Sequence, residues 1–274
     1  MIVILEKLET ELKLRGFTDE TLKAYLKFNK KFNEFIHKNP ERITTDDVKK
    51  YLAYLISDKK LKPASVNLAF SALKFYYDDI LKKKLFADLK PPKIEKKIPN
   101  ALAREEIRKM IDAEENIKHK LLISFMYASG LRVSECVSLK INDLNFEENM
   151  GKVISGKGRK DRYIKLSEKL VGDLKRYLKE RKESSDYIFP GVNNHLSVRM
   201  AQKIVKNAAK KADLKGRVHC HLLRSSFATH LLENGVDIRL IQELLGHSDL
   251  STTQRYTKVS TEQLKKVISP FDKF

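Results

Sequence analysis

The chain has 274 residues, of which 42% are hydrophobic and 33% are charged, and its formal net charge is +19 at pH 7. This composition predicts a folded protein, and the length favours two domains. The 55 Lys and Arg against 36 Asp and Glu favour a polyanionic partner, with nucleic acid as the leading candidate. No apolar run is long enough to span a membrane and no signal peptide is evident, so we expect a soluble, cytoplasmic protein without a membrane partner.

The first ninety residues follow a helical pattern, with apolar residues three and four positions apart. Thr18 and Thr45 each stand directly before such a run, where a hydroxyl side chain caps a helix, and Pro63 opens another run at its first turn. The pattern predicts four helices with short connections over residues 1–88. We expect these helices to form a small bundle.

Residues 89–102, with the sequence LKPPKIEKKIPNAL, break the helical pattern with three prolines and a cluster of lysines. Such a segment is extended and solvated, and we interpret it as a linker between two domains. Its lysines could lie along the phosphates of a nucleic acid, or the segment could be a plain charged spacer. The sequence does not separate these two interpretations.

The second domain, residues 103–274, is predicted to be mainly helical with a small antiparallel β-sheet. A helix pair is expected first, and Gly130 ends its second helix at a left-handed cap position. Residues 152–166 contain two short β-prone runs around Gly156, Lys157 and Gly158, which is typical of a hairpin or a small meander. Helices follow as far as residue 268, and the two cysteines in this domain are expected to be small buried hydrophobes rather than a disulfide.

Several polar residues in the second domain are candidates for chemistry, and each also has a purely structural interpretation. Arg132 and Glu135 are three positions apart, so they could be an ordinary helical ion pair. Lys157 stands between two glycines at the expected hairpin tip, where a lysine is usually just solvated. The run lacks the spacing of a P-loop, so a nucleotide-phosphate loop is excluded.

A second group of candidates lies nearer the C-terminus. His221 and Arg224 are three apart at the start of an expected helix, so their side chains project on the same side. Adjacent residues on a helix cannot all face one ion, which argues against a metal site at residues 219–221. Tyr256 follows His247 after a polar segment and could equally be a buried tyrosine with one hydrogen-bond partner.

Taken together, these side chains favour one reaction. Two arginines, a lysine and two histidines all donate hydrogen bonds to an anion. Preorganised cationic donors stabilise the charge that develops on a phosphodiester during displacement at phosphorus. A tyrosine beside such donors is then a candidate nucleophile, and a covalent intermediate would conserve the energy of the cleaved bond.

The order and spacing of these residues resemble the tyrosine recombinases of the phage integrase family, particularly the Xer group. The resemblance rests on Arg132 with Glu135, Lys157 in a β-turn, HLLR at 221–224 and LLGHSDLSTTQRYT at 244–257. In addition, LRGFTDETLKAYLKFNKKFNEFI and PASVNLAFSALKFYY resemble the helical, SAM-like core-binding domain of that family. The family implies a DNA-binding domain at residues 1–88 and a catalytic domain at residues 103–274.

The resemblance also implies the chemistry of strand cleavage. Tyr256 would attack the scissile phosphate and form a 3′-phosphotyrosyl link with a free 5′-hydroxyl, and Lys157 would protonate the leaving 5′-oxygen. One phosphodiester is exchanged for another, so neither a metal, another cofactor nor ATP is expected. The implied partner is a double-stranded DNA recombination site, bound by a tetramer that assembles through the C-terminal helix at residues 260–274.

The other roles implied by the family concern the phosphate. Arg132 and Arg224 would clamp its non-bridging oxygens, which suits bidentate guanidinium geometry better than lysine. His221 would assist proton transfer with the tyrosine, His247 would donate to the phosphate, and Glu135 would hold the site together. The sequence departs from the family at two places, Ser225 where a histidine is frequent and Ala103 where a capping Ser or Thr is common. The second departure predicts a weaker start for the helix that follows it.

Chromosome-dimer resolution is the biological role that the Xer resemblance implies. Three alternatives remain: a mobile-element integrase, a type IB topoisomerase, and a DNA-binding protein without activity. The chain begins directly at the core-binding domain, which disfavours an integrase with an additional N-terminal arm-binding domain. All six catalytic positions carry suitable residues, which disfavours an inactive protein.

Overall fold

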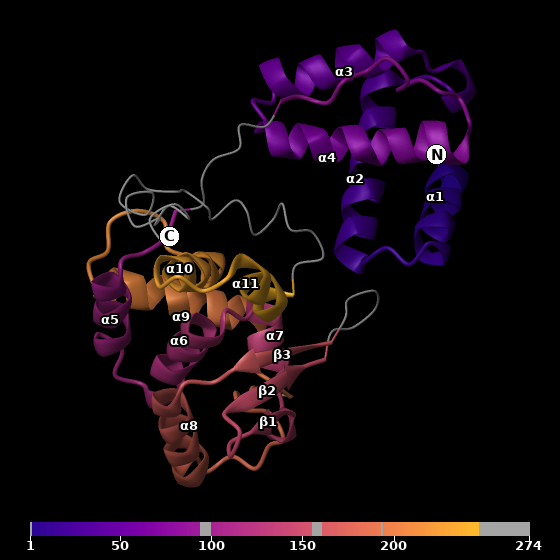
Figure 1. The fold of residues 1–274 in the computed structure, drawn as a ribbon. Coiled ribbons are helices and arrows are strands. Elements are labelled where there is room, and N and C mark those ends of the chain that lie inside the picture. The colour runs from indigo at the N-terminus through magenta and orange to yellow at the C-terminus, as the bar shows by residue number, and fades with distance from the viewer. Residues whose placement is uncertain (1, 94–99, 155–160, 193, 247–274) are drawn as a thin grey trace, which may run out of the picture. The chain divides into compact units, whose positions relative to one another are not determined.

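The computed structural model describes residues 2–93, 100–154, 161–192 and 194–246, and divides the chain into two compact units (Figure 1). The units are Met1–Lys96 and Lys97–Phe274. Lys157, His247, Tyr256 and the expected C-terminal helix lie outside the described residues. In the part of the chain that the structure describes, no helix combines the length and the apolarity that crossing a membrane requires.

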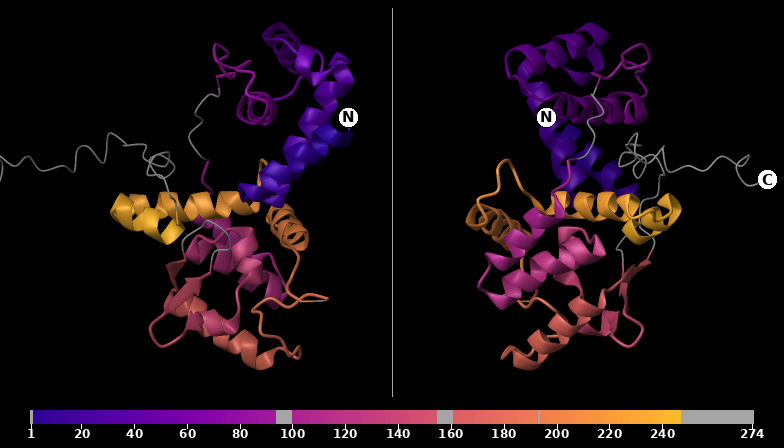
Figure 2. Two further views of the ribbon diagram at one scale, coloured as in Figure 1. Left: turned by 90° about the vertical axis from the view of Figure 1, so that its right-hand side faces the viewer. Right: turned by 60° about the vertical axis from the view of Figure 1, so that its left-hand side comes forward.

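The first unit is a helical bundle, as the sequence predicts (Figure 2). Its elements are α1 (Ile2–Leu14), α2 (Asp19–Ile36), a 3₁₀ turn (Pro40–Arg42), α3 (Thr45–Ser57) and α4 (Pro63–Lys74), which continues as a π-helical segment (Phe75–Ile80). Helix α2 begins at its predicted cap, because the Thr18 side chain accepts a hydrogen bond from the Thr21 N–H at 3.3 Å.

The predicted cap of α3 is wrong by one residue. Thr44, not Thr45, precedes the helix, because only Thr44 has an acidic residue at the third helical position. The Asp47 N–H donates to Thr44 Oγ1 at 3.3 Å, and the Thr44 N–H donates to Asp47 Oδ2 at 3.0 Å. The Thr45 hydroxyl instead donates to the carbonyl of Leu85 at 3.1 Å.

Aromatic side chains form much of the core of the first unit. Phe32 contacts Tyr51 and Tyr77 edge to face, with ring centroids 5.1 and 5.7 Å apart, and all three are buried. The buried amide of Asn29 donates to the Ala72 carbonyl at 3.0 Å, which joins α2 to α4. The bundle therefore has its own hydrophobic core.

The second unit is mainly helical with a small sheet, as predicted. Its helices are α5 (Arg104–Asp112), α6 (Ile117–Ser129), α7 (Val133–Ser138), α8 (Glu168–Glu180), α9 (Val198–Lys211), α10 (Cys220–Glu233) and α11 (Ile238–Leu245). Its strands are β1 (Leu144–Asn145), β2 (Met150–Val153) and β3 (Arg162–Lys165), antiparallel in the order β1-β2-β3. Strands β2 and β3 are the predicted hairpin, and Val153 pairs with Arg162 next to its tip.

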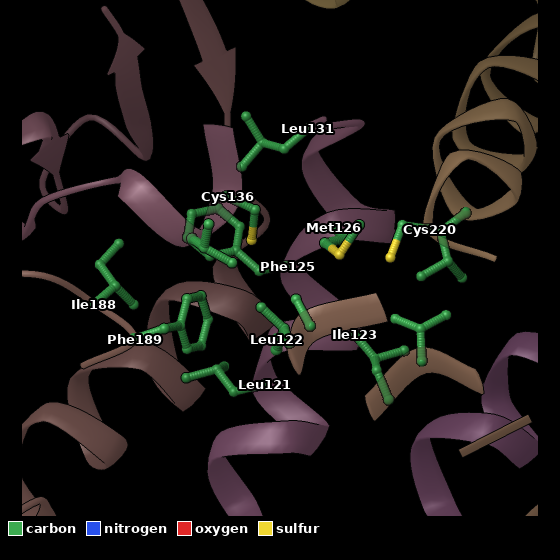
Figure 3. Packing of buried hydrophobic residues seen from close by; sticks show 14 of the residues in the cluster. Leu121, Leu122, Ile123, Phe125, Met126, Leu131, Cys136, Ile188, Phe189 and Cys220 are labelled. Atoms are coloured by element: carbon green, nitrogen blue, oxygen red, sulfur yellow. The ribbon is translucent and has the colours of Figure 1, made fainter. Parts of the chain in front are cut away.

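Helix α6 runs through the core of the second unit and packs against α8 and α10. Its apolar residues are buried on several faces, including Leu122, Phe125 and Met126 (Figure 3). Cys136 and Cys220 belong to the same core and are free thiols, which confirms their prediction as buried hydrophobes. Burial raises the pKa of both thiols, so both stay protonated at neutral pH.

The start of α5 shows how the chain compensates for Ala103 as a cap residue. Ala103 offers no side-chain acceptor, but its N–H donates to Glu106 Oε2 at 2.8 Å, which supplies half of a capping box. One residue earlier, the Leu102 N–H donates to Ser226 Oγ at 2.8 Å, and that hydroxyl donates to the Leu222 carbonyl. The beginning of this unit is thus fixed to α10.

Candidate active site

Arg132 and Glu135 are joined by the way α7 begins. Gly130 ends α6 with φ +59°, in the left-handed conformation that was predicted for it. Arg132 is the cap residue of α7, and its N–H donates to Glu135 Oε2 at 2.8 Å. Arg132 Nη1 also donates to Glu135 Oε1 at 2.7 Å. The carboxylate therefore holds both the backbone and the guanidinium of Arg132.

Arg162, which the sequence analysis did not single out, completes the binding of the carboxylate. Its Nη1 and Nη2 donate to the two oxygens of Glu135 at 2.9 and 2.7 Å, and its Nε donates to the Leu244 carbonyl at 2.9 Å. The side chain is only 4% exposed. The alternation along β3 places Arg162 on the same buried face as Ile164. An arginine at a core-facing position of a strand needs an anionic or hydrogen-bonding partner, and this pattern in the sequence could have indicated that Arg162 belongs to the site.

Arg224 approaches the same carboxylate from α10. Its Nη1 donates to the Gly130 carbonyl at 2.7 Å and its Nη2 to the Leu245 carbonyl at 2.6 Å. Nη1 also lies 3.9 Å from Glu135 Oε2. These two carbonyls come from the ends of α6 and α11, so they fix the plane of the guanidinium between the two helices. The side chain is 1% exposed.

The electrostatics of this cluster favour an anion. Burial by itself raises the pKa of the Glu135 carboxyl, but the hydrogen bonds and charge of Arg162, followed by the hydrogen bonds from Arg132, outweigh it and lower the pKa to about 2. Glu135 is therefore ionised at neutral pH. Three guanidinium charges against one carboxylate leave a net charge of +2 at the cluster of Arg132, Glu135, Arg162 and Arg224.

His221 lies in the first turn of α10, where the helix dipole adds positive potential. It lines an open groove of about 760 Å³, together with Val133 at the start of α7. The groove has a basic lining that comprises Lys206, Lys210, Arg217, His219 and His221. Among the described residues that line it there is no carboxylate. The groove is therefore suited to a polyanion.

Two other histidines in α10 have structural partners. His219 caps the helix, and its Nδ1 accepts a hydrogen bond from the Leu222 N–H at 3.1 Å. His230 is buried, and its Nδ1 is hydrogen-bonded to the Tyr127 hydroxyl at 2.8 Å. His230 is therefore a core residue whose hydrogen-bonding need is met inside the protein. Its pKa is lowered by burial, which favours the neutral ring.

The structure thus brings four residues together, three predicted and one not. Arg132, Glu135 and Arg224 meet as predicted, and Arg162 joins them. Two further candidates, Lys157 and His247, lie outside the described residues but are close in the sequence to residues that belong to this cluster or contact it. Arg162 begins the strand that follows Lys157 in the sequence, and Gly246 ends α11 directly before His247, with φ +62°.

The described residues thus form a helical bundle and a second, mainly helical unit that carries a cluster of guanidinium groups suited to an anion. Residues 100–263 match the phage integrase family, and residues 4–86 match the N-terminal SAM-like domain of phage integrases. The chain therefore belongs to the phage integrase family, that of the tyrosine recombinases.

Individual relatives are of the Xer type. The chain is 42% identical to tyrosine recombinase XerA of Pyrococcus horikoshii over 97% of this chain and 92% of that protein. A crystal structure of a XerA recombinase is 31% identical, covers 96% of both chains and has a TM-score of 0.56. The XerH site-specific recombinase bound to its difH substrate before cleavage is 26% identical, with a TM-score of 0.76, over 97% of this chain and 84% of that one.

Proposed function

We propose that the protein is a site-specific recombinase that cuts and rejoins duplex DNA and resolves chromosome dimers. The observation that carries this proposal is the cluster of Arg132, Arg162 and Arg224 around Glu135, in a chain of the tyrosine recombinase family. Preorganised guanidinium groups with a net charge of +2 are suited to the charge that develops on a phosphodiester in displacement. Xer recombinases among the relatives favour chromosome maintenance over a mobile-element role.

In the proposed reaction, the Tyr256 oxygen attacks the scissile phosphorus and the bond from phosphorus to the 5′-oxygen breaks. The products are a 3′-phosphotyrosyl bond and a 5′-hydroxyl, whose proton comes from Lys157, while His221 accepts the tyrosine proton. A 5′-hydroxyl from the partner duplex then attacks the phosphotyrosyl bond and releases Tyr256. Each step exchanges one phosphodiester for another, so the reaction needs no ATP, and in this proposal the cationic donors provide the charge stabilisation that a metal would otherwise supply.

In this proposal the phosphate is bound by Arg132 and Arg224, with His247 as a further donor. The side chain of Arg132 is 28% exposed, and Glu135 holds it through Nη1, so one edge of the guanidinium is fixed by the protein. Arg224 is fixed by the ends of α6 and α11. Glu135 is a supporting residue, because it orients Arg132 without carrying the charge that the phosphate requires.

The basic groove at the start of α10 is the proposed path of the DNA strand beside the scissile phosphate. Its lining includes His221 and Val133, the residue after Arg132. Salt-dependent binding to phosphates by its lysines and arginine would position the strand without reading its sequence. We keep the predicted division of the chain into a DNA-binding domain at 1–88, a linker at 89–102 and a catalytic domain at 103–274.

The oligomeric state and the cellular location of the protein are proposed from its membership of the family. A homotetramer on two recombination sites, coupled through the C-terminal helix at residues 260–274, is expected in the cytoplasm. Deletion of residues 260–274 tests the coupling. Strand exchange at the normal rate by the shortened protein would contradict it.

Covalent trapping of DNA tests the proposed function. Genomic DNA that becomes attached to the protein is isolated and sequenced, and the recovered site is rebuilt as a nicked suicide substrate. We expect the wild type to form a covalent adduct in the presence of EDTA and without ATP, and Tyr256→Phe to bind the same DNA but form none. A wild type that binds the site and forms no adduct would overturn the proposal. Relaxation of plasmids that lack the site, without strand exchange, would identify a topoisomerase instead.

A further inference from the structure

Arg162 connects three segments that are distant in the sequence. It begins β3, directly after the segment that contains Lys157 and Asp161, and contacts Glu135 in α7 and the end of α11. All three of its nitrogen atoms are engaged, Nη1 and Nη2 by the carboxylate and Nε by the Leu244 carbonyl. The guanidinium therefore faces the protein rather than a substrate.

The packing around Arg162 confirms how closely it is held. A Cβ atom placed on Gly246 would lie 2.6 Å from Arg162 Cδ, so the side chain passes directly against the glycine that ends α11. Gly246 has φ +62°, where glycine is strongly favoured. The arginine and the end of α11 are thus fitted to one another.

The carboxylate of Glu135 also depends on Arg162. Glu135 is 10% exposed, and a buried carboxylate needs charged or hydrogen-bonding partners to stay ionised. Among the residues that the structure describes, the charged groups that face it are Arg132 from the cap of α7, Arg162 from β3 and Arg224 from α10. Of these, only Arg162 donates two hydrogen bonds from its guanidinium, one to each carboxylate oxygen.

We propose that Arg162 is a positioning residue for strand cleavage, which holds Glu135 in the orientation that aims Arg132 and fixes the end of α11 to the same carboxylate. The inference rests on the proposed function. It assigns Arg162 no contact with the phosphate. Its effect on the reaction passes through Glu135 and through the segment that leads from Leu244 to His247.

A double-mutant cycle tests this role, with cleavage of the suicide substrate measured in single turnover. Arg162→Gln is expected to lower the cleavage rate by about 10- to 100-fold, by analogy with the residues that orient metal ligands in metalloenzymes, while the DNA affinity stays unchanged. Because Arg162 acts partly through Glu135, the double variant with Glu135→Gln should be clearly faster than the product of the two single losses predicts. Arg162→Lys keeps the charge but loses the bidentate geometry, so its cleavage rate should lie between those of the wild type and Arg162→Gln.

The pH profile gives a readout that a loss of stability alone would not change. In Arg162→Gln, burial acts on Glu135 with fewer opposing donors, so its pKa should rise. The cleavage rate of this variant should then fall as the pH is lowered through a range where the wild-type rate is constant. Adding Glu135→Gln should remove that fall.

Arg181 offers a control, because it is a half-buried arginine whose guanidinium, like that of Arg162, is held by several hydrogen bonds, in this case to two backbone carbonyls. Its Nη1 donates to the Tyr187 carbonyl at 2.6 Å and its Nη2 to the Ser185 carbonyl, away from the cluster around Glu135. Arg181→Gln should leave the cleavage rate and its pH profile unchanged. The melting temperature of each variant reports the structural contribution separately.

The possible results separate the inference from the proposed function. An Arg162→Gln variant as fast as Arg181→Gln, a double variant whose loss equals the product of the two single losses, or an unchanged pH profile would overturn the inference while the wild type still forms its adduct. Absence of the adduct in wild type would overturn the proposed function itself. If Arg162→Gln does not fold, the cycle of Arg162→Lys with Glu135→Gln gives the same comparison.

Discussion

The carbonyl of Leu245, the last residue of α11, accepts a hydrogen bond from Arg224 Nη2 at 2.6 Å. The preceding carbonyl, of Leu244, accepts one from Arg162 Nε at 2.9 Å. The last carbonyls of a helix have no hydrogen-bond donor inside the helix, and here Arg162 and Arg224 donate the missing hydrogen bonds. The same hydrogen bonds therefore cap the C-terminal end of α11 and orient the guanidinium groups of the cluster.

Arg224→Lys tests whether the guanidinium geometry is required. A lysine has one nitrogen and cannot bridge the Gly130 and Leu245 carbonyls while it also faces Glu135. We expect the cleavage rate to fall by about 100- to 1,000-fold, as for loss of a preorganised donor. Single-turnover cleavage measures this loss, and equilibrium binding to the same DNA is the control. A lysine variant with the wild-type rate would contradict the assigned geometry.

Gly130→Ala should destabilise the second unit. Gly130 has φ +59°, and an added Cβ atom would lie 2.3 Å from Cδ1 of Phe227, so the substitution combines backbone strain with a steric clash. We expect a loss of at least about 1 kcal/mol of unfolding free energy. Gly172→Ala in α8 is the matched control, because nothing lies within 4 Å of its added Cβ atom. In a helix interior this change should stabilise by up to about 1 kcal/mol, and thermal unfolding compares the two.

Glu135 should make the stability depend on pH in the acid range. Its pKa is about 2 in the folded protein and near the ordinary glutamate value when unfolded. Because the pKa of Glu135 is lower in the folded than in the unfolded protein, its ionisation stabilises the fold at pH values above the unfolded pKa. This contribution is lost as the pH falls from about 4.5 towards 2. The full contribution is about 3 kcal/mol.

The stability difference between wild type and Glu135→Gln should therefore be largest near neutral pH and shrink on acidification. Unfolding followed at several pH values from 7 to 2.5 measures it. A difference that stays constant over this range would show that the carboxylate is not held in its charged form. Glu105→Gln, an exposed glutamate in α5, serves as the control.

Lys206→Gln should weaken DNA binding and reduce its dependence on salt. Lys206 lines the basic groove, and each lost phosphate contact lowers the slope of log affinity against log salt by about one. Lys211→Gln on the same helix is the control, because Lys211 donates to Glu114 at 2.9 Å and lies outside this groove. Equal effects of the two variants on the salt slope would argue against the groove as the DNA path.

Much of the architecture could be predicted because it depends on local signals. The cap at Thr18, the proline start of α4 and the left-handed Gly130 all follow from single residues and their neighbours. The cap of α3 was misplaced because two threonines are adjacent, and Asp47 at the third helical position decides between them. That decision needed the reciprocal hydrogen bond, which a search for a hydroxyl alone does not consider.

The site was predicted less completely, for a physical reason. Arg132 and Glu135 are near neighbours in the sequence, and family-like spacing indicated Arg224. Arg162 is 27 residues after Glu135, with β1 and β2 between them in the sequence, and their contact depends on the tertiary packing that places β3 beside α11. Alternation along the four residues of β3 predicts that the Arg162 side chain is buried, but it does not predict that Glu135 is its partner.

The hydrogen bond from the Leu102 N–H to Ser226 Oγ has a mechanical consequence. Ser226 is two residues after Arg224 on the same helix, and its hydroxyl is also bound to the Leu222 carbonyl. A force on the chain before Leu102 would therefore act on α10, the helix that carries Arg224, as well as on α5, to which Leu102 is joined through the backbone. The force would enter α10 at Ser226, within one helical turn of Arg224 and its contact with Glu135.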